Sequence, residues 1–193
     1  MELEKDTVLS FQIKQLFQEL DHLEGLIEEL QGKINEQAFP FIKEIDILTS
    51  MKGISVFIAI AIIADIIKVD RFKNSKCFTS YLRSAPRVES SNTSTKNKGI
   101  NKKGRKLSAT LITQALNHVL DASPKLSLWY DQLTMHKKPG LVRTGLRRRV
   151  LAEIYQMLKK GEYHYGMEKQ KHEEKMRQYR NFLKKRKILF KIA

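Results

Sequence analysis

The chain has 193 residues and a mass of 22.5 kDa, enough for one medium domain with an appendage or for two small domains. Hydrophobic residues make up 41% and charged residues 30%, which excludes a disordered composition, and the single cysteine excludes a disulfide framework or a multi-cysteine zinc site. The N-terminus is acidic and polar, and the longest apolar run, residues 54–64, is too short to span a bilayer. We therefore expect a soluble, cytoplasmic protein, and the 9 glycines and 4 prolines favour an all-α fold.

The charge is divided unevenly along the chain, whose formal net charge is +15. Residues 1–50 hold 4 basic and 11 acidic residues, a net charge of −7, whereas residues 51–193 hold 32 and 10, a net charge of +22. A segment this basic favours binding to a polyanion, and nucleic acid is the expected one because Lys and Arg neutralise phosphates whatever the base sequence. The alternative is a lysine-rich surface that is only solvated.

Residues 1–39 predict one long helix with the seam of a coiled coil. Two apolar series repeat every seven residues, the second four residues after the first. The two series are Leu9, Leu16, Leu23 and Leu30, and Ile13, Leu20, Ile27 and Ile34. Because Ile at position a with Leu at position d favours two parallel strands, we expect a homodimer or higher oligomer through this helix. The alternative is an intramolecular hairpin in which the seam packs against a later helix, such as residues 167–190.

Residues 40–67 predict two helices joined by a tight turn. The segment from Leu48 to Ser55, followed by Ala59, has the spacing of a helix–hairpin–helix element, with Gly53 in the turn and Ser55 where the second glycine of that motif would stand. Such a turn directs backbone N–H groups at a DNA phosphate. The alternative is a plain helical hairpin with residues 54–64 buried in the core. Residues 75–84 predict a further short helix.

Residues 85–106 predict a loop, in which small hydroxyl residues are followed by cations with no acid among them. The cations are Lys96, Lys98, Lys102, Lys103, Arg105 and Lys106. One interpretation is a flexible linker that touches phosphate. The sharper one is a nucleophilic hydroxyl beside cations that stabilise a phosphoryl-transfer transition state.

The remaining segments predict helices. Residues 104–121 have an amphipathic pattern typical of a core helix. Arg143 and Arg147 are four residues apart on a later helix, and a shared helix face suits phosphate contact. Residues 167–193 predict a basic helical tail with a broken apolar stripe.

Four sequence blocks between residues 45 and 163 carry a family resemblance. They are residues 48–59 (LTSMKGISVFIA), 64–72 (ADIIKVDRF), 81–104, which includes YLRSAP and GINKKG, and 149–163 (RVLAEIYQMLKKGEY). In order and spacing they resemble the C-terminal domain of bacterial transposases of the insertion-sequence one-ten family, relatives of the Piv invertase. The N-terminal helix is similar to the helical segment that precedes this domain in the family.

The resemblance implies a mechanism and partners. The family serine that acts as nucleophile on the DNA backbone corresponds to Ser91, five residues after Pro86. The resemblance also implies a separate RNase H-like domain with four acidic metal ligands, and a structured guide RNA beside DNA. Asn92 replaces the glycine that follows the serine, and Ser108 replaces the leucine of a Leu-Arg pair, whose arginine is also missing.

These patterns predict three segments, residues 1–39 (coiled coil), 40–163 (transposase-like helical domain) and 164–193 (basic helical tail). We expect no metal site or cofactor in this chain, with Mg²⁺ bound only where an acidic RNase H-like domain is supplied from elsewhere. The expected function is DNA transposition and recombination, in a form truncated before the acidic domain and incomplete or inactive by itself. The alternative is a non-catalytic dimeric DNA- or RNA-binding protein; a membrane-surface protein fits poorly, and no membrane partner is expected.

Overall fold

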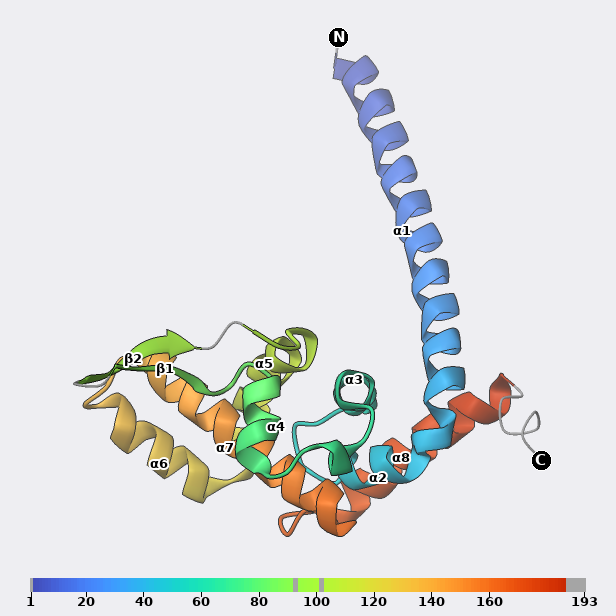
Figure 1. The fold of residues 1–193 in the computed structure, drawn as a ribbon. Helices are drawn as coiled ribbons and strands as arrows, with labels where there is room; N and C mark the ends of the chain where they lie inside the picture. The colour runs from blue at the N-terminus through green and yellow to red at the C-terminus, as the bar shows by residue number, and fades with distance from the viewer. Residues whose placement is uncertain (1, 92–93, 101–102, 187–193) are drawn as a thin grey trace. The chain divides into compact units, whose positions relative to one another are not determined.

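The computed structural model describes residues 2–91, 94–100 and 103–186. The chain divides into two compact units, residues 1–40 with 181–193, and residues 41–180. The elements are α1 (Glu2–Ala38), α2 (Ile42–Thr49), α3 (Val56–Ile66), α4 (Ser75–Tyr81), β1 (Pro86–Ser91), β2 (Ser94–Ile100), α5 (Leu107–Ala122), α6 (Pro124–Thr134), α7 (Pro139–Lys160) and α8 (Lys169–Lys185), with short 3-10 turns at Phe39–Phe41 and Val69–Arg71 (Figure 1). The predicted helical fold class is confirmed.

In the first unit, α1 is one uninterrupted helix whose heptad seam faces solvent. All eight seam side chains are exposed, from 38% at Ile34 to 64% at Leu16. The end of α8 touches a different face of α1, where the Arg186 guanidinium donates to the Glu28 backbone oxygen at 2.9 Å and pairs with the Glu28 carboxylate at 3.1 Å. The Arg186 side chain occupies the space beside Gly32 that a Cβ would fill. Within the described residues, no later helix covers the seam.

The core of the second unit lies along α7. Its residues Leu146, Leu151 and Ile154 are fully buried, and α7 packs against α2, α4, α5 and α6. Phe78 of α4 is also fully buried, with its ring 5.5 Å from that of Tyr155. Since α7 touches four other helices, it is the element that holds this unit together.

Helix α3 is apolar and buried on most of its surface, which agrees with the alternative of a helical hairpin that buries residues 54–64. Its residues Ile62 and Ile66 are buried, and the helix packs against α2 and α5. It is 11 residues long, and among the described helices none has the length and apolar character needed to cross a membrane.

Local sequence signals explain where several helices begin and end. Ser55 caps α3 by accepting from the Ile58 amide at 3.2 Å, and Asn74 caps α4 through the Cys77 amide at 3.0 Å. Ser123 caps α6 with Pro124 at the first helical position. Helix α7 ends at Gly161, whose φ of 69° is the left-handed conformation that glycine adopts without strain.

The predicted loop over residues 85–106 is wrong in part, because most of it forms an antiparallel hairpin. Strand β1 pairs with β2 in a register that joins Ser91 to Ser94 and Val88 to Asn97, with an irregularity near Pro86. Proline holds its backbone in an extended range, and β-branched residues favour strands, so these residues accept strand geometry despite their polar composition. The hairpin leaves the helical unit after α4 and returns to it before α5 (Figure 1).

Candidate nucleic-acid interface

The candidate nucleophile lies at the tip of the hairpin. Ser91 is the last residue of β1, its partner Ser94 is the first residue of β2, and only residues 92–93, which lie outside the described residues, connect them. Lys96 and Lys98 follow on the returning strand, and Lys96 pairs in register with Glu89. The predicted cation Lys102 lies outside the described residues. The strand pairing thus places Ser91 in the last residue pair before the turn of the hairpin.

The feet of the hairpin, defined as residues 81–85 and 103–106, are joined by backbone contacts. The Arg105 amide donates to the Tyr81 carbonyl at 2.9 Å, and the Arg83 Nε donates to the Gly104 carbonyl at 2.8 Å. Gly104 has a φ of 112°, and a Cβ there would overlap the Tyr81 carbonyl oxygen. The two feet therefore approach each other at a distance that only glycine permits.

Several cations surround these feet. The predicted residues Lys103, Arg105 and Lys106 are exposed, and the Arg105 Nε donates to the Tyr81 hydroxyl at 3.3 Å. The guanidinium of Arg71, also exposed, lies 5.0 Å from the centre of the Tyr81 ring. Exposed cations beside the half-buried Tyr81 ring suit phosphate contacts.

Sequence reasoning missed Arg71 and Arg83 as members of this cluster. Arg71 stands in the second family block and Arg83 in the third, so both lay inside stretches already singled out. Their proximity to residues 103–106 depends on the meeting of segments that lie about twenty residues apart for Arg83 and more than thirty for Arg71. No local spacing signals that meeting.

Arg143 and Arg147 of α7 share a face, as predicted, but that face points at the protein. The Arg143 guanidinium donates to the Thr113 carbonyl of α5 at 3.1 Å. Arg147 makes three bonds, from Nε to the Ser84 hydroxyl at 2.9 Å, from one terminal nitrogen to the Thr113 hydroxyl at 2.9 Å, and from the other to the Arg83 carbonyl at 2.8 Å. Burial lowers the pKa of Arg147. These donors are used within the fold, so phosphate contact by Arg143 and Arg147 stays a prediction.

The turn between α2 and α3 places Gly53 against α5. Gly53 has a φ of 89°, and a Cβ there would lie 2.9 Å from a methyl carbon of Val119 and 3.0 Å from the Val119 backbone nitrogen. Ser55 is exposed, but its hydroxyl already accepts from the Ile58 amide. The close approach of the turn to α5 explains the glycine without a DNA phosphate, so phosphate contact by this turn stays a prediction.

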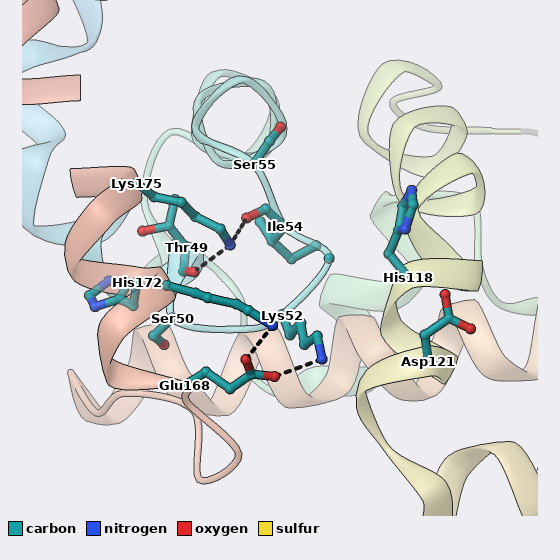
Figure 2. Close-up of a pocket in the computed structure, with 12 residues that line it drawn as sticks. Thr49, Ser50, Lys52, Ile54, Ser55, His118, Asp121, Glu168, His172 and Lys175 are labelled. Atoms are coloured by element: carbon teal, nitrogen blue, oxygen red, sulfur yellow. Dashed lines mark hydrogen bonds and ion pairs between the residues drawn. The ribbon is translucent and has the colours of Figure 1, made fainter. Parts of the chain in front are cut away.

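A pocket of about 320 Å³ lies between the α2–α3 turn, α5 and the start of α8. Figure 2 shows Lys175 reaching the turn, where its ammonium donates to the Thr49 carbonyl at 3.3 Å and the Ile54 carbonyl at 3.1 Å. Hydrogen bonds from Lys171 and then Lys52 lower the pKa of Glu168 to about 2. The three ammonium groups that line the pocket thus have protein partners, and the contacts anchor the turn to α8 rather than present free charge.

The two aspartates of the second family block have structural contacts. Asp65 is 8% exposed and accepts from both the amide and the hydroxyl of Ser108, at 3.0 and 2.6 Å. Asp70 pairs with Lys159 at the surface. Among the described residues no group of three or more His, Cys, Asp or Glu side chains could hold a metal ion. The described residues therefore offer no ligand set for the Mg²⁺ that the family resemblance assigns to a separate domain, and we derive no step through a metal.

Residues 45–131 match the family model of the transposase IS116/IS110/IS902 family. No curated protein sequence matches the chain. The match includes the α2–α3 turn, the hairpin with Ser91 and helix α5, whereas the fourth block at residues 149–163 lies beyond it.

Proposed function

We propose, from the transposase-family domain that residues 45–131 carry, that this chain is a transposase of that type acting on DNA, with Ser91 as its nucleophile. The observation that carries the proposal is the place of Ser91 at the tip of a hairpin whose feet are surrounded by exposed cations. A hydroxyl at a tip reaches into a DNA groove or along a strand more easily than one on the surface of a helix.

In the proposed step the Ser91 oxygen attacks a backbone phosphorus. A bond forms between that oxygen and phosphorus while the bond from phosphorus to one bridging oxygen breaks, so one strand end becomes a phosphoserine ester and the other a free hydroxyl. The serine proton has to leave to a base, because an unactivated hydroxyl is a weak nucleophile. Cations at the feet, such as Arg71 and Arg105, would bind phosphates further along the same DNA and so hold it against the hairpin. The activating acidic groups would have to come from outside the described residues.

The test is the formation of a covalent protein–DNA adduct by the full chain. End-labelled duplex DNA is incubated with wild type, Ser91→Ala or Ser90→Ala in Mg²⁺, with and without an RNase H-like domain added as a separate chain, and then denatured. Ser90 is the matched control because it is the same residue type one position earlier in β1, paired with Thr95. We expect an adduct from wild type and Ser90→Ala, and a loss of at least about 1000-fold in Ser91→Ala, since the attacking atom is gone.

A second candidate, a non-catalytic DNA- or RNA-binding protein, is favoured by the structural use of Asp65 and Asp70. This second candidate predicts tight, salt-sensitive binding to duplex DNA or structured RNA. It also predicts no adduct, whether or not the RNase H-like domain is added. Affinity should fall steeply with salt, because each phosphate that is neutralised releases about one counterion. An adduct that persists in Ser91→Ala would contradict the assignment of the nucleophile, and absence of binding to both polymers would contradict both candidates.

We also propose that the chain self-associates through the α1 seam. The eight seam side chains are exposed along one helix face with the heptad spacing of a coiled coil. Burial against a second copy removes this apolar surface from water and is the main gain expected from association.

Replacing Leu23 by Asp should abolish this association, with the dissociation constant rising at least about 100-fold because a charge enters the apolar seam. Gln18→Asp is the control, since Gln18 lies outside both apolar series of the same helix. Sedimentation equilibrium of the full chain gives the oligomeric state. A monomeric wild type, or equal weakening by the two substitutions, would contradict the seam as the interface.

A further inference from the structure

We infer that Arg147 is a positioning residue that holds the feet of the serine-bearing hairpin against α5 and α7; its catalytic consequence rests on the proposed role of Ser91. Arg147 stands on α7, more than fifty residues after Ser91 in the chain, and belongs to no feature of the hairpin itself. Its guanidinium nevertheless reaches the segment where β1 begins.

The three hydrogen bonds of Arg147 converge on two separate segments. Nε and one terminal nitrogen donate to the Ser84 hydroxyl and the Arg83 carbonyl, which lie in the turn between α4 and β1. The remaining nitrogen donates to the Thr113 hydroxyl of α5. A planar guanidinium presents its donors in a rigid fork, so three bonds at 2.8–2.9 Å fix the turn in direction as well as in distance.

A chain of hydrogen bonds links Arg147 to both feet of the hairpin. Arg83 accepts from Arg147 through its carbonyl and donates through Nε to the Gly104 carbonyl at 2.8 Å. Ser84, which accepts from Arg147, is only 1% exposed, and its amide donates to the Thr79 carbonyl of α4 at 2.8 Å. Arg147 is therefore bonded to the foot before β1 and, through Arg83, to the foot after β2.

Position matters for the proposed reaction because Ser91 stands at the end of a ladder of only two strands. An isolated two-stranded hairpin is marginally stable. A small change of direction at the feet displaces the tip by a larger distance, and a misplacement of about 1 Å at a reacting atom lowers rates by about a hundredfold. The direction of the two-stranded ladder that carries Ser91 is thus set at the feet, where Arg147 acts.

The test compares Arg147→Gln with Arg143→Gln in the full chain. Arg143 is the matched control, because it lies one turn away on α7 and bonds to Thr113 but to neither foot of the hairpin. Amide hydrogen exchange is measured for residues 87–91 and 94–100 and for α5 and α7. We expect exchange in the hairpin to rise at least about tenfold in Arg147→Gln only, with α5 and α7 changing far less. Arg147→Lys should be intermediate, since an ammonium cannot reproduce the planar fork.

Adduct formation supplies the second readout. At saturating DNA, Arg147→Gln should lower the rate of the Ser91 adduct at least about tenfold while the DNA dissociation constant changes less than twofold, which is the pattern of a positioning residue. If wild type forms no adduct, the proposed role of Ser91 fails and hydrogen exchange alone decides the role of Arg147. Equal hairpin exchange in Arg147→Gln and Arg143→Gln, or a rise spread evenly over α5 and α7, would overturn the inference.

Discussion

Replacing Asp65 by alanine is expected to lower the free energy of unfolding by about 3 kcal/mol or more. Asp65 in α3 is the acceptor for two donors of Ser108, which is fully buried in the first turn of α5. Without the carboxylate, the Ser108 amide loses its acceptor in a dry environment, and α5 loses a negative charge at its N-terminus. The hydroxyl of Ser108 keeps one alternative, the Ala61 carbonyl at 3.2 Å.

The control for this experiment is Asp70→Ala. Asp70 belongs to the same sequence block, but its side chain is 77% exposed and pairs with Lys159 at the surface. Exposed pairs contribute little to stability, so the urea midpoint should barely move in this variant. Urea unfolding, monitored by circular dichroism, measures the midpoints of the two variants. Equal midpoints for Asp65→Ala and Asp70→Ala would show that the buried carboxylate does not cap α5.

The same contact explains a departure from the family pattern. In the family resemblance, Ser108 of this chain stands where the family has the leucine of its Leu-Arg pair. The structure places Ser108 inside the protein, bonded to Asp65. A residue whose role is to satisfy a buried carboxylate can be understood only together with its partner, forty-three residues earlier in the chain.

The helices were the part of the fold that sequence patterns predicted well. Heptad spacing in residues 1–39 and the apolar run in residues 54–64 correspond to α1 and α3, with Ser55 as the cap of the latter. These signals are local, because the period of a helix and the capping of its first turn involve residues at most a few positions apart.

Features that depend on distant partners were predicted poorly. The spacing of Arg143 and Arg147 correctly placed them on one face of α7, but a helix wheel cannot tell whether that face meets solvent or protein. The face meets protein because the two arginines bond to Thr113 and Ser84, which lie thirty or more residues away in the sequence. The hairpin was missed for a related reason: its strands are polar and short, and its stability depends on pairing rather than on an apolar pattern.

Gly104→Ala should destabilise the protein by about 3 kcal/mol or more and separate the feet of the hairpin. The φ of 112° at Gly104 lies outside the left-handed helical region that other residues occasionally adopt. The added Cβ would also overlap the Tyr81 carbonyl oxygen and lie 3.0 Å from its carbonyl carbon. Both are backbone atoms and cannot rotate away, so the contact between Arg105 and Tyr81 has to break.

Gly99→Ala in β2 is the matched control, because it removes a glycine with positive φ while leaving the added methyl group in open space. Gly99 has a φ of 55°, and no atom lies within 4 Å of the position of its Cβ. Both substitutions reduce the freedom of the unfolded chain equally, so their difference reports the close approach at Gly104 together with the greater backbone strain of its φ of 112°. We expect a loss of about 1 kcal/mol for Gly99→Ala. Urea unfolding gives the two free energies, and amide hydrogen exchange in the hairpin should rise sharply only for Gly104→Ala. Equal losses of unfolding free energy in the two variants would mean that the feet tolerate separation and that other contacts hold the hairpin.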